Sequence, residues 1–320
     1  MSIWKETNMS SPQETWLVTG ASGCIGAWTV LTLVKEGAEV VALDRGTAND
    51  RLRLIGGGGL KPARAVDVDI RDLGGLEGVL AEHAVTHVIH LAALQAPFCK
   101  ADPAQGAEVN VAGTTNLFEA ARRHGLRAPI AYASSAAVYD AAGETFTPTT
   151  IYGVYKIANE GSARLYWQES QVASVGLRPL VVYGGGRDCG MTAAPTQAMA
   201  AAARGEPFNI PFGGSTQLQY GADAARAFID AARRPATGAE VYNMGGPDVS
   251  IEEIVAAIEE AAPGARVTFD DVALPFASRL PEPWFEMPVT PLAEGVATTV
   301  ELYRRAAQPA AVAPGPVHWA

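Results

Sequence analysis

The sequence has few cysteines and no grouping of residues that is typical of a metal site. Cys24, Cys99 and Cys189 are odd in number and far apart, and they form no CxxC pair. Such cysteines favour a reducing compartment, so we expect a cytoplasmic protein. The carboxylates between residues 67 and 72 lie where a strand should give way to a helix, and Asp72 is a natural helix cap. We therefore predict no metal.

Positive charge is also scarce. Lys and Arg together number 24 against 34 Asp and Glu, which gives a formal net charge of -10. An acidic chain without a dense basic run is a poor partner for nucleic acid or an anionic membrane. No apolar stretch is long enough to span a bilayer, and residues 1–14 contain no apolar core of a signal peptide. These absences predict a soluble protein that binds neither nucleic acid nor membrane.

Apolar content, by contrast, is high. Hydrophobic residues make up 48% of the 320, enough for a large core. Short runs rich in β-branched residues alternate with segments of helical length, which predicts an α/β protein with a doubly wound parallel sheet, the Rossmann fold. The expected strands are 16–19, 39–43, 63–68, 87–92 and 130–134, followed later by a helix over 223–234 and a strand over 240–244.

A glycine-rich turn follows the first expected strand. Residues 19–26 read TGASGCIG and lead into an amphipathic helix. Glycines let the backbone approach a pyrophosphate, and the helix N-terminus supplies partial positive charge. Asp44 ends the second strand, where a carboxylate can accept hydrogen bonds from ribose hydroxyls. It also repels the 2′-phosphate of NADP by about 4 kcal/mol at intermediate dielectric, although Arg45 can offset part of this. The predicted cofactor is NAD.

The strand–helix rhythm stops after Gly184, where Gly, Pro and Ala become frequent, so a second lobe is expected there. Because the strand over 240–244 should return to the sheet, the two lobes are interleaved. We expect an N-terminal extension at 1–14, an NAD-binding domain at 15–183 with a return segment at 223–245, a smaller C-terminal substrate-binding lobe at 184–222 and 246–305, and a flexible tail at 306–320.

Tyr152 and Lys156 stand four residues apart at the start of a helical stretch, so their side chains share one face. Forming a phenolate at neutral pH costs about 4 kcal/mol for a free tyrosine, whose pKa is near 10. A neighbouring ammonium and an oxidised nicotinamide can offset that cost. The pair therefore predicts a tyrosine that acts as a general acid and base.

Several short motifs occur in a fixed order between residues 15 and 245: TGASGCIG at 19–26, HLAA at 90–93, Asn110 with Gly113-Thr114, Ser134-Ser135, Tyr152-x-x-x-Lys156 and Arg178-Pro179. This ordered set resembles the extended short-chain dehydrogenase/reductases, the NAD-dependent epimerase/dehydratase family. Residues 150–154 also resemble the L-threonine dehydrogenase-like members.

The resemblance implies that Ser135 hydrogen-bonds the reacting oxygen, that Tyr152 takes its proton, and that Lys156 binds the nicotinamide ribose and lowers the pKa of the tyrosine. A helix cap is the alternative role of Ser135. The helices over 110–124 and 152–170 resemble those that pair such proteins into homodimers. The implied cofactor-binding residues are Gly20, Gly23, Cys24, Ile25, Gly26, Asp44, Asp69, Ile70, Leu91, Ala92, Ala93, Tyr152, Lys156 and Pro179.

The leading functional hypothesis is an oxidoreductase that moves a hydride between NAD and a secondary alcohol or ketone of a small-molecule substrate: a sugar, a sugar acid or a hydroxy-amino acid. The alternative is a sugar or nucleotide-sugar epimerase with tightly bound NAD. A third possibility, a catalytically idle NAD-binding regulator, is disfavoured because such a protein does not need Ser135, Tyr152 and Lys156, and all three are present. Dehydration is disfavoured because Ala136 and Ala137 stand where dehydratases carry acidic residues.

Two departures favour a small substrate over a nucleotide diphosphate sugar. Val181 stands where relatives that bind such sugars have the asparagine of an Arg-x-x-Asn segment. The stretch 214–220 also lacks the arginine with which these relatives grip a phosphate. Arg187 or Arg204 is the available substitute.

Overall fold

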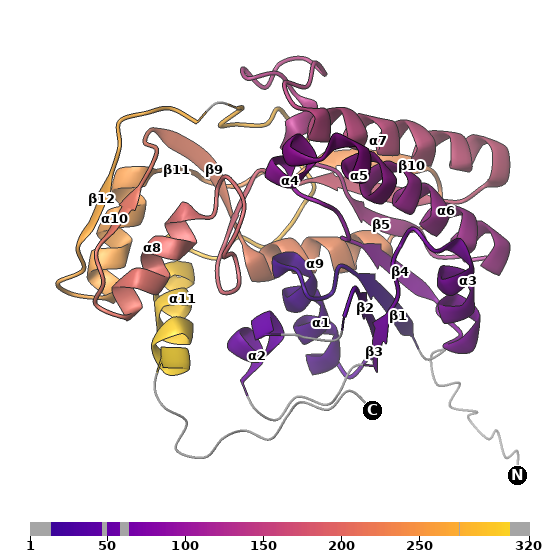
Figure 1. Ribbon diagram of the computed structural model, residues 1–320, viewed down its shortest axis with the longest axis horizontal. Coiled ribbons are helices and arrows are strands. Elements are labelled where there is room, and N and C mark those ends of the chain that lie inside the picture. The colour runs from indigo at the N-terminus through magenta and orange to yellow at the C-terminus, as the bar shows by residue number, and fades with distance from the viewer. Residues whose placement is uncertain (1–13, 47–49, 58–63, 275, 308–320) are drawn as a thin grey trace, which may run out of the picture.

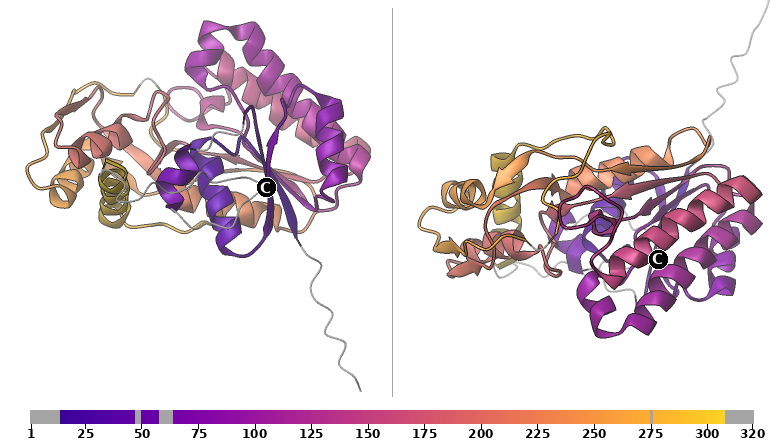
Figure 2. Two further views of the ribbon diagram at one scale, coloured as in Figure 1. Left: turned by 60° about the horizontal axis from the view of Figure 1, so that its bottom comes forward. Right: turned by 90° about the horizontal axis from the view of Figure 1, so that it is seen from above.

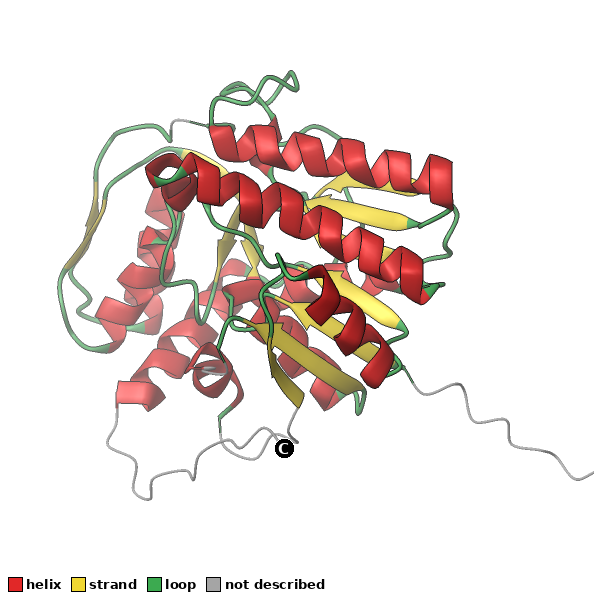
Figure 3. Ribbon diagram, turned by 45° about the vertical axis from the view of Figure 1, so that its right-hand side comes forward, coloured by secondary structure: helices red, strands yellow, loops and turns green. Residues whose placement is uncertain are grey.

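The computed structural model describes residues 14–46, 50–57, 64–274 and 276–307. Its centre is a parallel seven-stranded sheet in the order β10-β6-β5-β4-β1-β2-β3 (Figures 1 and 3). This order confirms the doubly wound sheet. The strands are β1 (Thr15–Thr19), β2 (Glu39–Asp44), β3 (Arg64–Asp67), β4 (His87–His90), β5 (Ile130–Ala133), β6 (Ser174–Arg178) and β10 (Ala239–Asn243).

Helices cover both faces of the sheet. On one face lie α1 (Cys24–Lys35) and α9 (Gly221–Ala232), and on the other α3 (Leu73–Glu82), α6 (Gly113–His124) and α7 (Ile151–Ser170). Because side chains alternate along a strand, β1 contributes to two cores: Trp16 and Val18 pack with the first group, Leu17 with the second. The near-continuous apolar strands follow from burial on both faces.

The chain leaves the sheet after β6 and builds a smaller lobe beside it (Figure 2). There α8 (Ala194–Ala203), α10 (Ile251–Ala261) and α11 (Leu292–Ala307) pack together. Strands β7 (Val181–Tyr183), β9 (Ser215–Tyr220) and β11 (Asp248–Ser250) form a three-stranded sheet, and β8 (Phe208–Ile210) pairs with β12 (Val267–Phe269). The remaining elements are α2 (Asp50–Gly56), α4 (Ala96–Ala101), α5 (Pro103–Ala107), the π-helix η1 (Glu108–Ala112) and the 3-10 helix η2 (Ala136–Val138).

The expected strands are present, with ends that differ by one or two residues; β4, for example, ends at His90 rather than at residue 92. The expected return of the chain to the sheet is also present, because β10 pairs in parallel with β6. Most of the predicted extension at 1–14 and of the tail at 306–320 lies outside the described residues. Helix α11 includes the first two residues of that tail.

Within the described ranges, no helix is long and apolar enough to cross a membrane.

Candidate cofactor and catalytic site

The site lies where the strands of the large sheet end. In the sheet, β2 lies on one side of β1 and β4 lies on the other, so the strand order reverses direction at β1. Doubly wound sheets bind their ligands in the crevice at such a reversal. A cavity of about 740 Å³ opens there. All the predicted site residues line it: Gly20, Gly23, Cys24, Ile25, Gly26, Asp44, Asp69, Ile70, Leu91, Ala92, Ala93, Ser135, Tyr152, Lys156 and Pro179.

The glycine turn between β1 and α1 is shaped by close backbone approach. Gly20 has φ +69°, and a Cβ there would lie 2.6 Å from the backbone nitrogen of Ala92. A Cβ on Gly26 would lie 2.1 Å from the carbonyl oxygen of Gly20. Side chains are therefore excluded at both positions, and the start of α1 stays close to the cavity. Such a turn at a helix N-terminus fits a pyrophosphate.

Asp44 ends β2 with its carboxylate at the cavity wall. Its two oxygens accept the backbone N–H groups of Ser22 and Arg45, at 2.8 Å each. Carboxylate oxygens have about four acceptor sites between them, so capacity remains for ribose hydroxyls. The residues around this end of the cavity fit the adenosine half of NAD.

The nearby carboxylates have separate partners. Asp69 pairs with Arg71 at 2.7 Å, and Asp72 caps α3 by accepting the N–H of Gly75 at 3.0 Å. Asp67 accepts the N–H of Gly46. In the described part of the chain, no three metal-ligating side chains gather in one place.

Helix α7 carries the tyrosine and the lysine. Thr150 caps it by accepting the N–H of Gly153 at 3.1 Å. Tyr152 is half-buried, and burial raises its pKa to about 12, whereas its hydrogen bond with Ser135 and the positive charge of Arg187 act in the opposite direction. A tyrosine with this pKa is a proton donor at neutral pH and needs further positive charge to become a base.

Lys156 is 3% exposed, and its Nζ donates a hydrogen bond to the carbonyl of Ala133 at 2.7 Å. Nζ lies 5.5 Å from the centroid of the Tyr152 ring. Burial lowers the pKa of Lys156 to about 8, so the ammonium persists at neutral pH. The pKa of Tyr152 is thus raised overall, and the residues that act against this rise are Ser135 and Arg187 rather than Lys156.

Ser135 has the capping role considered for it, and it also lines the cavity. Its Oγ accepts the N–H of Ala137 at 3.1 Å and so caps η2, and its side chain lies in the wall of the cavity that Tyr152 also lines. Ser134, which precedes it, donates to Glu160. Glu160 forms a largely buried ion pair with Arg178 at 2.7 Å, which fixes the end of β6 against α7.

Asn110, noted above only as part of a motif, supports the loop after β4. It accepts the N–H of Leu94 at 2.7 Å and donates to the Leu94 carbonyl at 2.9 Å. It lies in the π-helix η1, a distortion that recurs at functional sites. Its position in the motif gave no indication of this contact, because the pairing depends on the three-dimensional path of the loop.

Sequence reasoning missed a link between the glycine turn and the smaller lobe. Arg51 on α2 donates to the carbonyl of Ser22 at 2.7 Å and forms a two-pronged pair with Asp188, with nitrogen–oxygen distances of 3.0 and 2.7 Å. Arg187, which was noted only as a substitute cation, lines the cavity next to this pair. Arg204, the other substitute, instead pairs with Glu206 at 2.7 Å.

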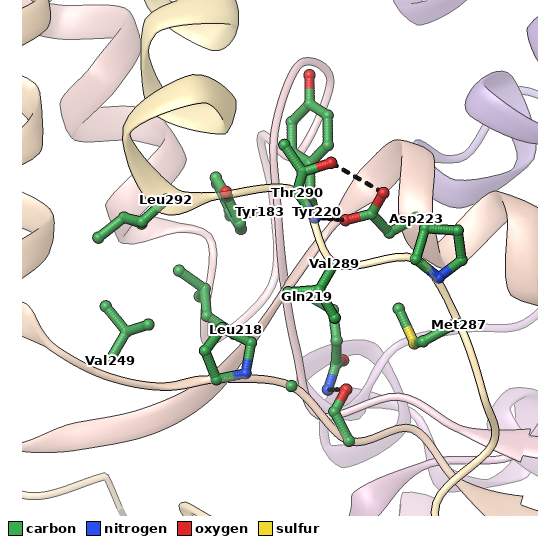
Figure 4. Close-up of a pocket in the computed structure, with 14 residues that line it drawn as sticks. Tyr183, Leu218, Gln219, Tyr220, Asp223, Val249, Met287, Val289, Thr290 and Leu292 are labelled. Atoms are coloured by element: carbon green, nitrogen blue, oxygen red, sulfur yellow. Dashed lines mark hydrogen bonds between the residues drawn. The ribbon is translucent and has the colours of Figure 1, made fainter.

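A second recess lies in the smaller lobe (Figure 4). Its volume of about 10 Å³ is room for about one water molecule. Asp223 lies beside it and accepts hydrogen bonds from the backbone N–H and the hydroxyl of Thr290, at 2.7 and 2.9 Å. This recess is too small for a substrate.

Comparison with known proteins identifies the family. The model of the NAD dependent epimerase/dehydratase family matches residues 16–245. UDP-glucose 4-epimerase of Mycolicibacterium smegmatis is 31% identical, over 91% of this chain and 99% of that protein. The structure of Thermus thermophilus UDP-glucose 4-epimerase with NAD is 26% identical in sequence, with a TM-score of 0.73. The structure of a partial consensus L-threonine 3-dehydrogenase is 25% identical, with a TM-score of 0.76. Each of these two comparisons covers 91% of this chain and 99% of the other chain. The chain therefore belongs to the NAD-dependent epimerase/dehydratase family and is an NAD-dependent enzyme of the extended short-chain dehydrogenase/reductase type.

Proposed function

We propose that the protein is an oxidoreductase that moves a hydride between NAD and the secondary alcohol or ketone of a small hydroxylated substrate, such as a sugar, a sugar acid or a hydroxy-amino acid. The observation that carries the proposal is the grouping of Ser135, Tyr152 and Lys156 in the same 740 Å³ cavity as the glycine turn. The hydroxyl-bearing side chains of Ser135 and Tyr152 line this one cavity, which supports a shared contact with one reacting oxygen.

When bound, NAD supplies the ring that accepts or returns the hydride. Tyr152 would take the proton of the substrate hydroxyl during oxidation and return it during reduction. Ser135 would hydrogen-bond the same oxygen and hold it against the phenol. Lys156, charged at neutral pH and fixed by the Ala133 carbonyl, would bind the nicotinamide ribose.

Two features of the smaller lobe support a small substrate. Val181, at the position of the relatives' asparagine, is fully buried in β7 and packs into the core. Strand β9 contributes no lining side chain to the described wall of the large cavity. Its Gln217 and Gln219 accept the backbone N–H groups of Leu280 and Leu180 at 2.8 and 2.9 Å, so they serve the lobe's own packing.

Nucleotide-sugar epimerisation is the second candidate, because the epimerase of Mycolicibacterium smegmatis matches this chain over 99% of its length. An epimerase needs the same serine, tyrosine and lysine, so the three side chains favour neither candidate. The difference lies in whether the oxidised intermediate leaves the enzyme or is reduced again in place.

The test is a screen of polyols, sugar acids, hydroxy-amino acids and nucleotide sugars with added NAD, in which NADH and product isomers are followed together. Net NADH with a small substrate is the expected result. Isomerised UDP-sugar without net NADH would establish the epimerase instead. In a calorimetric titration of the NAD-loaded protein, micromolar binding of UDP, dTDP or GDP would contradict the small substrate.

We also propose a homodimer in which the α7 helices of two copies pack together. Ile151, Val154 and Leu165 are 40%, 46% and 44% exposed, and their spacing places them on one stripe of α7. Sedimentation should give twice the chain mass, and replacing Val154 and Leu165 together by Glu should give the monomer. A wild-type chain that sediments as a monomer at micromolar concentration would contradict this.

The free thiols Cys24, Cys99 and Cys189 support our proposal that the enzyme works in the reducing cytoplasm.

A further inference from the structure

Arg187 is a cavity-lining cation that has no ion-pair partner among the described residues; Arg45, beside Asp44, and Lys156, bound to the Ala133 carbonyl, are the others. Arg187 lines the cavity, and no carboxylate of the described residues forms an ion pair with it. Its guanidinium donates one hydrogen bond, from Nη2 to the hydroxyl of Thr192 at 3.2 Å, while its Nε is buried without a hydrogen-bond partner among the described side chains and backbone. A buried donor without a partner is costly, and a guanidinium is best satisfied by two parallel bonds to one carboxylate.

The loop that carries Arg187 is held firmly in place. Arg187 donates its backbone N–H to Gly184 at 3.0 Å, and Gly186 donates to the Tyr303 hydroxyl at 3.2 Å. The neighbouring Asp188 is bound by Arg51. The side chain therefore extends into the cavity from a loop that is fixed by hydrogen bonds. A fixed side chain loses less conformational entropy when it binds a ligand than a flexible one does.

Glycine at position 190 leaves room for the end of this side chain. Gly190 has φ +100°, and a Cβ there would lie 3.1 Å from Nη2 of Arg187 and 2.3 Å from Oε1 of Gln95. Any larger residue would push into both polar groups. The loop is thus built around the guanidinium and the amide of Gln95, both of which line the cavity.

Charge in the cavity is distributed unevenly. Its acidic lining residues within the described ranges, Asp44 and Asp69, follow β2 and β3, where the adenosine half of NAD fits. Arg187 instead lies in the loop after β7 and acts electrostatically on both Tyr152 and Cys24, so its charge lies between the reacting end and the glycine turn. The same cavity therefore holds the hydroxyl pair of Ser135 and Tyr152 and a positive charge that has no ion-pair partner among the described residues.

We propose that Arg187 binds a carboxylate of the substrate, so that the enzyme acts on hydroxy acids of sugar type rather than on neutral sugars or polyols. The inference rests on the proposed function, since it specifies the substrate class of the same site. The carboxylate is held by the guanidinium while the hydroxyl to be oxidised lies at Ser135 and Tyr152. Arg is suited to this because its planar fork matches a carboxylate in two parallel bonds.

The test compares acids with their own neutral derivatives. Gluconate, galactonate, glucuronate and threonate are each paired with the primary amide, and KM is measured with wild type, Arg187→Met, Arg187→Lys and Arg204→Met. We expect the acid's KM to rise about a hundredfold in Arg187→Met, to rise less in Arg187→Lys, and to stay unchanged in Arg204→Met. The amide's KM should change little in every variant.

A binding experiment separates this inference from the proposed function. Calorimetry of NAD-loaded Tyr152→Phe protein with the same four acids, with and without Arg187→Met, measures recognition without turnover, and circular dichroism verifies that each variant is folded. Binding that depends on Arg187 supports the inference even if no acid is oxidised. Failure of all four acids to bind, equal binding of acid and amide, or a loss of NAD affinity in Arg187→Met would overturn it. Binding of UDP or inorganic phosphate through Arg187 in place of the acids would also overturn it.

Discussion

At the scale of single residues, Tyr152 and its neighbour Tyr155 provide a matched pair. Tyr152 lines the cavity, whereas Tyr155, on the same helix, donates its hydroxyl to the carbonyl of Pro103 at 2.7 Å. We predict that Tyr152→Phe lowers kcat/KM by at least about a hundredfold with NAD affinity nearly unchanged, because the phenol carries the proton and not the cofactor. Tyr155→Phe should retain activity. Kinetics and NAD titration measure both, and near-wild-type turnover in Tyr152→Phe would place the base elsewhere.

Asp44 should decide the choice between the two nicotinamide cofactors. Its carboxylate stands at the end of β2 facing the cavity, where a 2′-phosphate would meet like charge. We predict that NAD binds at least about ten times more tightly than NADP, and that Asp44→Asn reduces this difference in affinity. Direct titration with both cofactors measures it. Tighter binding of NADP to the wild type would mean that Arg45 governs this end of the cavity.

At the scale of elements, the start of α7 matters because the helix carries two site residues in its first two turns. The caps of α7 and α10 are comparable: Thr150 accepts from Gly153, and Ser250 accepts from Glu253, both at 3.1 Å. We predict that Thr150→Ala and Ser250→Ala each lower the free energy of unfolding by about 1 kcal/mol.

Only the first of these changes should lower kcat, because only α7 positions the tyrosine. Thr150→Ser keeps the cap and should restore most of the activity. Urea unfolding and steady-state kinetics on the three variants measure this. Equal loss of kcat in Thr150→Ala and Ser250→Ala would show that general destabilisation, rather than the position of α7, limits the rate.

The doubly wound parallel sheet followed from the sequence because apolar runs and helical segments alternate locally, although β6 was not among the expected strands. The glycine turn, Asp44 and the Tyr152–Lys156 pair were also predictable, since each is defined by short spacing. The bond between Arg51 and Asp188 was not, because the two residues are 137 positions apart and each alone is an ordinary charged residue. The contact of Lys156 with the Ala133 carbonyl likewise depends on how α7 packs against β5.

At the scale of the whole molecule, His90 should couple stability to pH. It is 4% exposed and lies between the hydroxyls of Thr19 and Thr114, at 2.7 and 3.0 Å. Burial lowers its pKa from 6.5 to about 3. Between these values the unfolded chain binds a proton that the folded chain does not, so stability is lost as pH falls from 6.5 towards 3, by up to about 1.4 kcal/mol per pH unit.

Urea unfolding at several pH values measures this dependence. His90→Gln should be less stable at pH 7 and should lose less stability on acidification than the wild type. His83→Gln is the control, because His83 lies only partly buried at the end of α3, where its Nδ1 contacts Arg64. The same acid dependence in His90→Gln and wild type would assign the effect to other groups.

The outer position of β10 has a consequence for synthesis on the ribosome. Strand β6 is paired on one side by β5 as soon as both have emerged, but its other side is covered only by β10, which follows the first part of the smaller lobe. At roughly 5–20 residues per second, the nascent chain exposes a bare strand edge for several seconds. Such an edge is a template for pairing with other chains. Slowing translation just after β6 should therefore increase aggregation, whereas slowing it after β10 should not.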